Sequence, residues 1–165
     1  MTVTLHEVSF VPLFRGMPPA EIERVLKFAA VESFSADRTL INEGAKSASL
    51  MYVILEGEVE ILKRDATGRD ILLSSLQRGQ FFGEMALFTR APRSATARSK
   101  TPVRLLMLAR SNFERLMHGE PAVMQTFIQT MAQRLNETSE QLAAMEQSDT
   151  SKQAPELLQT GTAWA

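Results

Sequence analysis

The chain contains no cysteine among its 165 residues. This excludes disulfide bonds and thiolate metal sites, and it fits a reducing compartment such as the cytoplasm. The chain also has no excess charge of one sign, because 18 lysines and arginines face 19 aspartates and glutamates. A formal net charge of -1 argues against a protein that coats DNA or an anionic membrane through bulk charge.

Long apolar runs are missing as well. No uninterrupted apolar stretch approaches the roughly 20 residues that cross a bilayer. The longest candidate, residues 50–55, is followed directly by Glu56-Gly57-Glu58. The N-terminus, Met-Thr-Val-Thr-Leu-His, lacks the charged start and apolar core of a secretory signal. We therefore expect a soluble cytoplasmic protein that does not bind membranes.

The residues that are present fit a single globular domain. Hydrophobic residues make up 44% of the chain and charged residues 22%, which is typical of soluble proteins. The length suffices to bury a core. We expect one domain over residues 1–147. Residues 148–165 begin Ser-Asp-Thr-Ser-Lys-Gln-Ala-Pro, which predicts a flexible tail.

The middle of the chain is rich in short β-type runs separated by glycine or polar turns. These runs are residues 31–34, 39–41, 50–55, 59–63, 70–76, 95–98 and 103–108. Many short strands at this spacing predict an antiparallel sandwich or barrel rather than alternating βαβ units. In the run 59–63, Val59, Ile61 and Lys63 alternate with their neighbours, which indicates one apolar and one solvated face.

Helices are expected on both sides of these strands. Pro18-Pro19 opens an apolar-periodic stretch, and proline is well tolerated at the start of a helix. After the strands, Ser111 and Glu114 have the spacing of a capping box. A longer helix is expected over residues 121–147, where apolar residues step by fours and threes around one polar member, Thr138. This heptad seam, which predicts a homodimer, comprises Met124, Ile128, Met131, Leu135, Leu142 and Met145.

The segment 82–99 carries the residues best suited to bind an anion. Gly83 allows a close backbone approach or a positive φ. The good helix formers that follow predict a short helix whose first N–H groups would point at a ligand. Arg93 supplies a fixed charge with a planar donor fork suited to phosphate. Ser94 adds a hydroxyl, and Ala95 leaves its own N–H accessible.

Glu84 is the unexpected member of this segment, because a carboxylate repels phosphate. It fits a ligand that also offers hydroxyl donors, as a ribose does. The residues alone leave two interpretations open. One is a site for a sugar-phosphate, and the other is a surface ion pair of Glu84 with Arg93 beside an ordinary turn.

The order Gly-Glu-x-Ala-Leu followed by Pro-Arg-Ser-Ala-Thr resembles the phosphate-binding cassette of the cyclic-nucleotide-binding domain family. Residues 40–44 and 51–59 are similar to the early strands of that family. The resemblance covers residues 14–145. It implies an α+β fold: an antiparallel β-roll or jelly-roll barrel with N-terminal helices, a short phosphate-binding helix and a long C-terminal helix.

The resemblance also implies a role for each residue of the site. Glu84 would accept the ribose 2′-hydroxyl, Arg93 would pair with the cyclic phosphate, and Ser94 would face the phosphate or the base. Ala86 and Ala95 would offer backbone N–H groups. The implied ligand-binding set is Gly83, Glu84, Met85, Ala86, Arg93, Ser94 and Ala95.

A base pocket is implied at the barrel wall, where Ile61 and Leu73 match apolar contacts of the family and Phe82 lies beside the cassette. Plain core packing explains Ile61 and Leu73 equally well. In the catabolite activator family a Thr-Ser pair of the long helix contacts adenine, and Thr138 and Ser139 stand at those positions.

The long helix leaves further alternatives open. Arg134 matches a place where some channel-type domains put an arginine over the purine, and its alternative is a solvated face. Thr138 could instead set the register of a coiled coil. Serine after the cassette arginine resembles the cAMP binders, whereas threonine there often accompanies cGMP selectivity. We therefore expect cAMP as the ligand, with a cGMP-preferring binder as the alternative.

The resemblance stops short of a DNA-binding protein. Residues 148–165 are too few for the helix-turn-helix domain of the catabolite activator family, so we expect no DNA binding by this chain alone. The alternative is a regulatory fragment of a larger transcription factor or channel. His6 and His118 have no matched carboxylate or metal spacing, so we expect no enzyme activity, catalytic residue, metal or cofactor. The signal would pass through the long helix to an unknown downstream protein.

Overall fold

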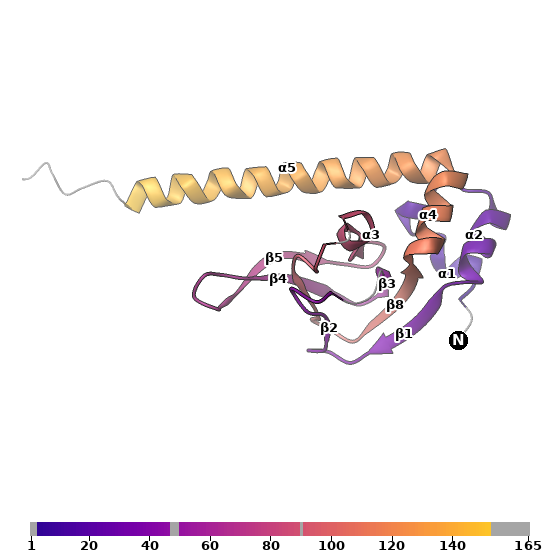
Figure 1. Cartoon of the computed structure of the whole chain (residues 1–165), viewed down its shortest axis with the longest axis horizontal. Coiled ribbons are helices and arrows are strands. Elements are labelled where there is room, and N and C mark those ends of the chain that lie inside the picture. The colour runs from indigo at the N-terminus through magenta and orange to yellow at the C-terminus, as the bar shows by residue number, and fades with distance from the viewer. Residues whose placement is uncertain (1–2, 47–49, 90, 153–165) are drawn as a thin grey trace, which may run out of the picture. The chain divides into compact units, whose positions relative to one another are not determined.

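A computed structural model of the chain describes residues 3–46, 50–89 and 91–152, with side chains to residue 145. The chain divides into two compact units, Met1–Thr126 and Phe127–Ala165. The first unit contains the helices and strands that precede the long helix (Figure 1).

The first unit opens with three short helical segments: α1 (Leu5–Val8), the 3-10 helix η1 (Pro12–Phe14) and α2 (Pro19–Leu26). Helix α2 begins at the second proline of the pair, as the sequence predicts, because the missing N–H of Pro19 costs no bond in a first turn. Its buried face carries Ile22 and Leu26.

Two four-stranded antiparallel sheets form the centre of this unit, which confirms the predicted fold class. One sheet has the order β1-β8-β3-β6, with strands β1 (Ala30–Phe34), β3 (Leu50–Glu56), β6 (Phe81–Phe82) and β8 (Val103–Ala109). The other has the order β2-β7-β4-β5, with strands β2 (Thr39–Ile41), β4 (Val59–Arg64), β5 (Asp70–Leu76) and β7 (Thr96–Ser99). Each predicted β-type run overlaps one of these strands. Strand β6, with two residues, is too short to show a period.

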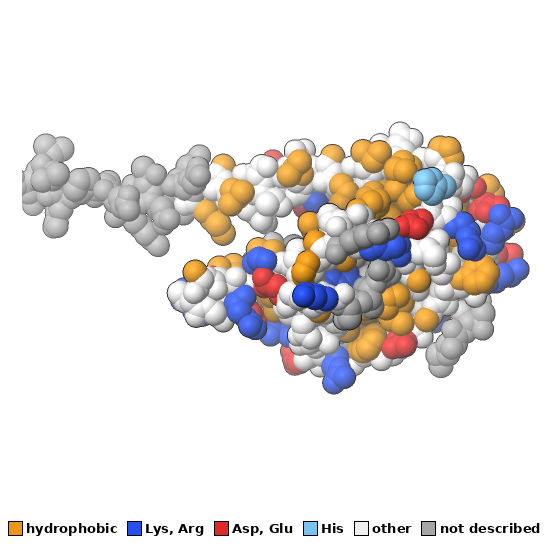
Figure 2. Space-filling view, viewed as in Figure 1, with side chains coloured by type: hydrophobic (Ala, Val, Ile, Leu, Met, Phe, Trp, Pro, Cys, Tyr) orange, Lys and Arg blue, Asp and Glu red, His pale blue; other side chains and the backbone are white. Residues whose placement is uncertain are grey.

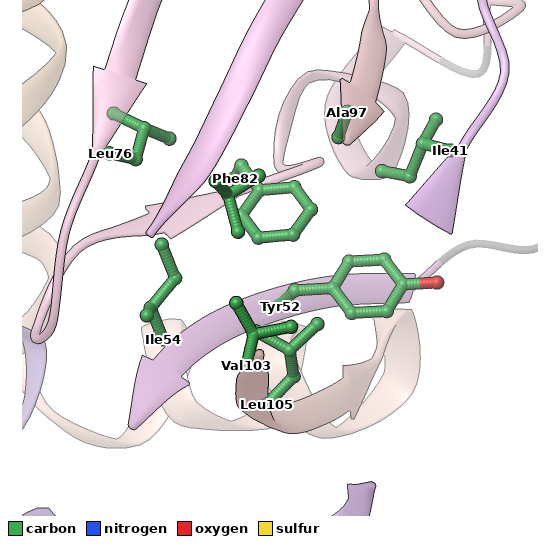
Figure 3. Close-up of a cluster of buried hydrophobic side chains, with 9 residues drawn as sticks. Ile41, Tyr52, Ile54, Leu76, Phe82, Ala97, Val103 and Leu105 are labelled. Carbon is green, nitrogen blue, oxygen red and sulfur yellow. The ribbon is translucent and has the colours of Figure 1, made fainter. Parts of the chain in front are cut away.

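The core lies between the two sheets (Figure 3). The rings of Tyr52 and Phe82 stack at 5.0 Å between centroids, with their planes 10° apart. Aliphatic side chains from both sheets surround them: Ile41, Ile54, Val59, Leu76, Ala97, Val103 and Leu105. Full burial of a valine, leucine or isoleucine side chain contributes about 1.5–3 kcal/mol. The ring of Phe82 thereby anchors the residue that precedes the cassette.

Strand β4 departs in part from the predicted pattern of one apolar and one solvated face. Its register with β5 shifts between Ile61 and Leu62, since Ile61 pairs with Ser74 and Leu62 pairs with Leu72. Leu73 is therefore the extra residue of a β-bulge on β5. Strand β4 itself stays in regular register with β7 from Val59 to Leu62, and Val59 and Ile61 pack on the core as predicted. Leu62 is also buried, so the prediction that the opposite face is solvated is wrong at this residue.

The start of helix α4 (Arg110–Gly119) also differs from prediction. Its N-cap is Ala109, which has no side-chain capping bond, so the predicted capping box of Ser111 and Glu114 is wrong. The physical reason is that β8 runs directly into α4 (Figure 1), which places Ser111 inside the first turn. A capping box exists instead at α1, between Thr4 and Glu7.

Glu7 also ties α1 to the sheet. Its carboxylate lies 2.7 Å from Nη1 of Arg104 on β8. A backbone hydrogen bond from Thr4 and the side-chain bond from Arg104 lower the pKa of Glu7 from 4.5 to about 2. A lowered pKa means that the carboxylate contributes stability above its unfolded value of 4.5 and loses that contribution as the pH falls towards about 2.

We therefore expect Glu7→Gln to lower the free energy of unfolding at neutral pH. The difference from the wild type should shrink as the pH is lowered from about 5 to about 2, because protonation removes the same charge in the parent protein. Urea unfolding at a series of pH values measures this difference. A difference in the free energy of unfolding that stays constant over this pH range would contradict the role assigned to the Glu7 carboxylate.

The second unit is formed by helix α5 (Pro121–Lys152), whose first residues belong to the first unit. The helix continues past the predicted end at Gln147, because an established helix extends through residues of poor propensity at small cost. The rest of the predicted tail, residues 153–165, lies outside the described residues. Hydrophobic side chains recur along α5 (Figure 2), and the exposed ones include Ile128, Leu135, Leu142 and Met145.

Candidate ligand-binding site

The predicted cassette forms a loop between β6 and β7. Gly83 follows β6 with a φ of +80°, and the short helix α3 (Met85–Thr89) starts two residues later, as predicted. A Cβ atom on Gly83 would lie 3.0 Å from Nη1 of Arg93 and 3.1 Å from the carbonyl oxygen of Leu50. The positive φ and the two close neighbours together explain why glycine is needed here.

Arg93 lies in the second half of this loop, and its side chain contacts the start of the loop at Gly83. Its side chain is 6% exposed. Nη1 donates to the carbonyl oxygen of Gly83 at 2.8 Å, and Nη2 donates to that of Leu50 at 2.8 Å. Burial lowers the pKa of Arg93 below its usual value, while the charges of Tyr52 and Glu84 act against this shift. The guanidinium therefore joins the start of the cassette to strand β3.

Glu84 is the second charged residue inside the loop, and its side chain is also 6% exposed. Glu84 interacts electrostatically with Arg93. Such burial does not fit a surface ion pair. Buried charges contribute little net stability, because desolvation offsets their attraction. A loop that nevertheless buries a carboxylate and a guanidinium is a candidate functional site.

The backbone donors of the cassette lie at the start of α3 and on the return to β7. The Leu87 N–H bonds to the Glu84 carbonyl at 2.9 Å. The N–H groups of Met85 and Ala86 lie before the first carbonyl partner within this helix, so the helix itself does not use them. On the return limb, the exposed Ser94 hydroxyl donates to Sδ of Met85 at 3.6 Å, and Ala95 is half-buried. The loop thus contains a buried guanidinium, a buried carboxylate and hydrogen-bond donors both at the start of α3 and on the segment that returns to β7.

The predicted base-pocket residues occupy three different surroundings. Ile61 is partly buried against the core, and Leu73 is exposed at the bulge of the neighbouring strand β5. Phe82 is 3% exposed with one ring face against Tyr52. Core packing thus explains the position of Phe82 and the buried part of the Ile61 side chain, whereas Leu73 exposes side-chain surface to which a ligand has access.

Three further predicted residues belong to the second unit. The hydroxyl of Thr138 donates to the Arg134 carbonyl at 2.8 Å, and that of Ser139 donates to the Leu135 carbonyl at 2.9 Å. Both are local bonds to the preceding turn of the helix. The roles of Arg134, Thr138 and Ser139 toward a base stay predictions.

The structure adds contacts that sequence reasoning missed. The ammonium of Lys63 donates to the Ser94 carbonyl at 2.6 Å and pairs with Glu43 at 2.6 Å. The Arg110 guanidinium donates to the Ala86 carbonyl at 2.6 Å. One signal was available, because Lys63 continues the same strand face as Val59 and Ile61, where a third apolar side chain would be expected.

In the part of the chain that the structure describes, no group of three or more His, Cys, Asp or Glu side chains could hold a metal ion. Over the same residues, no helix has the length and apolar character that crossing a membrane requires.

Sequence comparison finds relatives over most of the chain. The family model described as cyclic nucleotide-binding domain matches residues 31–120. The cAMP-activated global transcriptional regulator CRP of Salmonella typhimurium is 32% identical over 130 residues, which are 77% of this chain and 61% of the relative. A CRP-like cAMP-activated global transcriptional regulator of Mycobacterium tuberculosis is 28% identical over 79% of this chain and 58% of its own length. The chain thus spans about three fifths of the curated relatives it matches.

Structure comparison finds the same fold. The Thermus thermophilus catabolite activator protein matches with a TM-score of 0.72 and 27% identity, over 82% of this chain and 63% of that one. The regulatory domain of Toxoplasma gondii PKA, solved with cAMP, matches with a TM-score of 0.68 over 78% of this chain and 48% of that one. At 24% identity, the latter likeness concerns the fold alone.

Proposed function

The chain belongs to the cyclic nucleotide-binding domain family, and from this premise we propose that it binds a cyclic nucleotide as a regulatory ligand. The observation that carries the proposal is the burial of Arg93 and Glu84 in one loop, within the residues that the family model matches. Arg93 would pair with the cyclic phosphate, and Glu84 would accept the ribose 2′-hydroxyl. Backbone N–H groups of Ala86 and Ala95 would complete the phosphate site.

We further propose that cAMP is the preferred ligand. Ser94 supports this preference, because a serine after the cassette arginine resembles the cAMP binders, and Ser94 is exposed. The printed names of the relatives describe cAMP-activated regulators, which supports the same choice. Thr138 and Ser139 are the proposed contacts to adenine. A cGMP-preferring binder is the second candidate, since a serine hydroxyl could also serve the amino group of guanine.

The proposed role is regulatory and not enzymatic. The relatives are named as regulators, which supports ligand binding without a chemical step. The downstream partner is proposed to be another protein. Because the chain matches only part of each relative, we propose a second candidate identity for it: the cyclic-nucleotide-binding part of a larger transcription factor or channel. Cytoplasmic location and the absence of DNA and membrane binding by this chain belong to the same proposal.

Contacts inside the first unit support a route for the signal. Arg110 of α4 donates to the carbonyl of Ala86, the residue whose own N–H is proposed to face the phosphate. The rings of Phe88 on α3 and Phe113 on α4 meet edge to face at 5.6 Å. Ligand capture would order residues 83–95 and shift α4, and α5 follows directly in the chain. The ligand drives this change only as far as it binds one state more tightly.

The long helix is the proposed dimer interface. Its apolar residues Ile128, Leu135 and Leu142 follow a heptad and are exposed in the single chain. A second copy of residues 121–147 would cover them. A shift of α4 and α5 would thereby reach the dimer interface and, through it, the downstream protein.

Calorimetric titration with cAMP and cGMP, combined with light scattering, tests the proposed function. We expect one site per chain, a dissociation constant of about 1 μM or lower for cAMP, which is about -8 kcal/mol, and weaker binding of cGMP. The mass should be that of a dimer, and cAMP should be recovered without 5′-AMP. Absence of saturable binding by either nucleotide would contradict the proposal.

A further inference from the structure

Lys63 on β4 joins three segments that are far apart in the sequence. Its ammonium donates to the carbonyl oxygen of Ser94 at 2.6 Å and pairs with Oε1 of Glu43 at 2.6 Å. From this contact we propose that Lys63 is a positioning residue, which holds the peptide group between Ser94 and Ala95 in the orientation that binds the ligand phosphate. The inference rests on the proposed function.

The direction of the Ala95 N–H depends on the geometry of one peptide group. The carbonyl of Ser94 and the N–H of Ala95 belong to the same rigid plane and point in opposite directions. A bond that fixes the Ser94 oxygen therefore also fixes the direction of the Ala95 N–H. That N–H is one of the proposed phosphate donors. A charged donor on the carbonyl also polarises the peptide group, which strengthens its N–H as a donor.

Glu43 holds the ammonium in place. Its second carboxylate oxygen accepts from the Arg64 N–H at 3.0 Å, and its own N–H donates to Oγ1 of Thr96 at 3.1 Å. The hydrogen bond from Lys63 lowers the pKa of Glu43, so this carboxylate is ionised at neutral pH. Lys63 is therefore oriented by a residue whose carboxylate is bonded to β4 and whose backbone N–H is bonded to β7.

The turn that carries Glu43 also holds the neighbouring residue of the cassette. The Gly44 N–H donates to the Arg93 carbonyl at 2.8 Å, and the Arg93 N–H donates to the Ala45 carbonyl at 3.0 Å. The backbone of Arg93 is thus fixed from the turn, and the carbonyl of the next residue is fixed by Lys63. Arg93 and Ser94 of the cassette are thus held by the turn at residues 43–45 and by β4.

A second lysine–glutamate pair in the same molecule shows what a purely structural role for Lys63 would look like. Lys100 pairs with Glu58 at 2.8 Å, and their side chains are 49% and 22% exposed. The values for Lys63 and Glu43 are 46% and 27%. Exposed pairs of this kind contribute little to stability. Lys63 differs in its bond to a cassette carbonyl.

The test compares Lys63→Met, Lys63→Arg and Lys100→Met in the full chain. We expect Lys63→Met to raise the dissociation constant for cAMP about tenfold, because a charge-assisted bond is lost. Lys63→Arg keeps a charged donor and should stay within about twofold of the wild type. Lys100→Met should leave affinity unchanged. All three should melt within a few degrees of the parent protein.

A second measurement needs no ligand. The carbonyl carbon resonance of Ser94 in the unliganded protein should move in Lys63→Met and not in Lys100→Met. An unmoved resonance would overturn the proposal whatever the affinities are. A moved resonance with unchanged cAMP affinity would overturn the positioning role. If the wild type binds neither cAMP nor cGMP while the resonance moves, the proposed function fails and the fixing of the peptide group stands.

Discussion

Replacing Arg93 by alanine is expected to weaken cAMP binding by about a hundredfold, which corresponds to about 3 kcal/mol. The guanidinium is the buried cation of the cassette, with Arg93 6% exposed. Without it, Glu84 would face the phosphate as an uncompensated carboxylate. Calorimetric titration at a temperature where the variant is folded measures the loss.

This variant also removes structural bonds, so it requires a matched control. Arg93 donates to the carbonyls of Gly83 and Leu50, and their loss should lower the melting temperature by several degrees. Arg93→Lys keeps the charge but not the planar fork, and we expect it to bind cAMP with an intermediate affinity. Wild-type affinity in folded Arg93→Ala would remove the phosphate role from this residue.

The largest effect on stability is expected for Gly57→Ala. Gly57 connects β3 to β4 with a φ of +86°. A Cβ atom there would lie 2.2 Å from the Pro102 carbonyl oxygen and 2.8 Å from Cγ1 of Val103. Backbone strain and overpacking together should cost about 3 kcal/mol or more, a large part of the stability of a domain this size.

Gly68→Ala is the control for this prediction. Gly68 has a φ of +85°, and, apart from its two chain neighbours, no heavy atom of the described residues lies within 4 Å of the position of its Cβ. The control therefore carries the backbone strain alone, about 1–2 kcal/mol. Urea unfolding of both variants separates the two contributions. Equal stability of the two variants would show that the contact with Pro102 relaxes without cost.

Much of the fold could be predicted from the sequence because the short strands are separated by clear turn signals. The exceptions have local causes. The face of β4 that was predicted to be solvated is not solvated throughout, because Leu62 is buried. The capping box at Ser111 fails because β8 leads into α4 without a loop. Both depend on tertiary pairing, which a local pattern does not contain.

The candidate site also contains residues that could be predicted from the sequence and residues that could not. The cassette residues could be found because glycine, glutamate, arginine and serine occur in a short segment with a recognisable order. Glu43 and Lys63 could not, because they are about twenty residues apart in sequence and meet only through the sheet. The contact of Lys63 with Ser94 depends on the pairing of β4 with β7.

The central claim is that the cassette holds the phosphate of a cyclic nucleotide. Titration of the wild-type chain with cAMP, followed through the amide resonances of the protein, tests this most directly. We predict saturable shifts that are largest for Gly83, Ala86 and Ala95 and that reach saturation at one nucleotide per chain. Saturable shifts located elsewhere, or none at all, would contradict the claim.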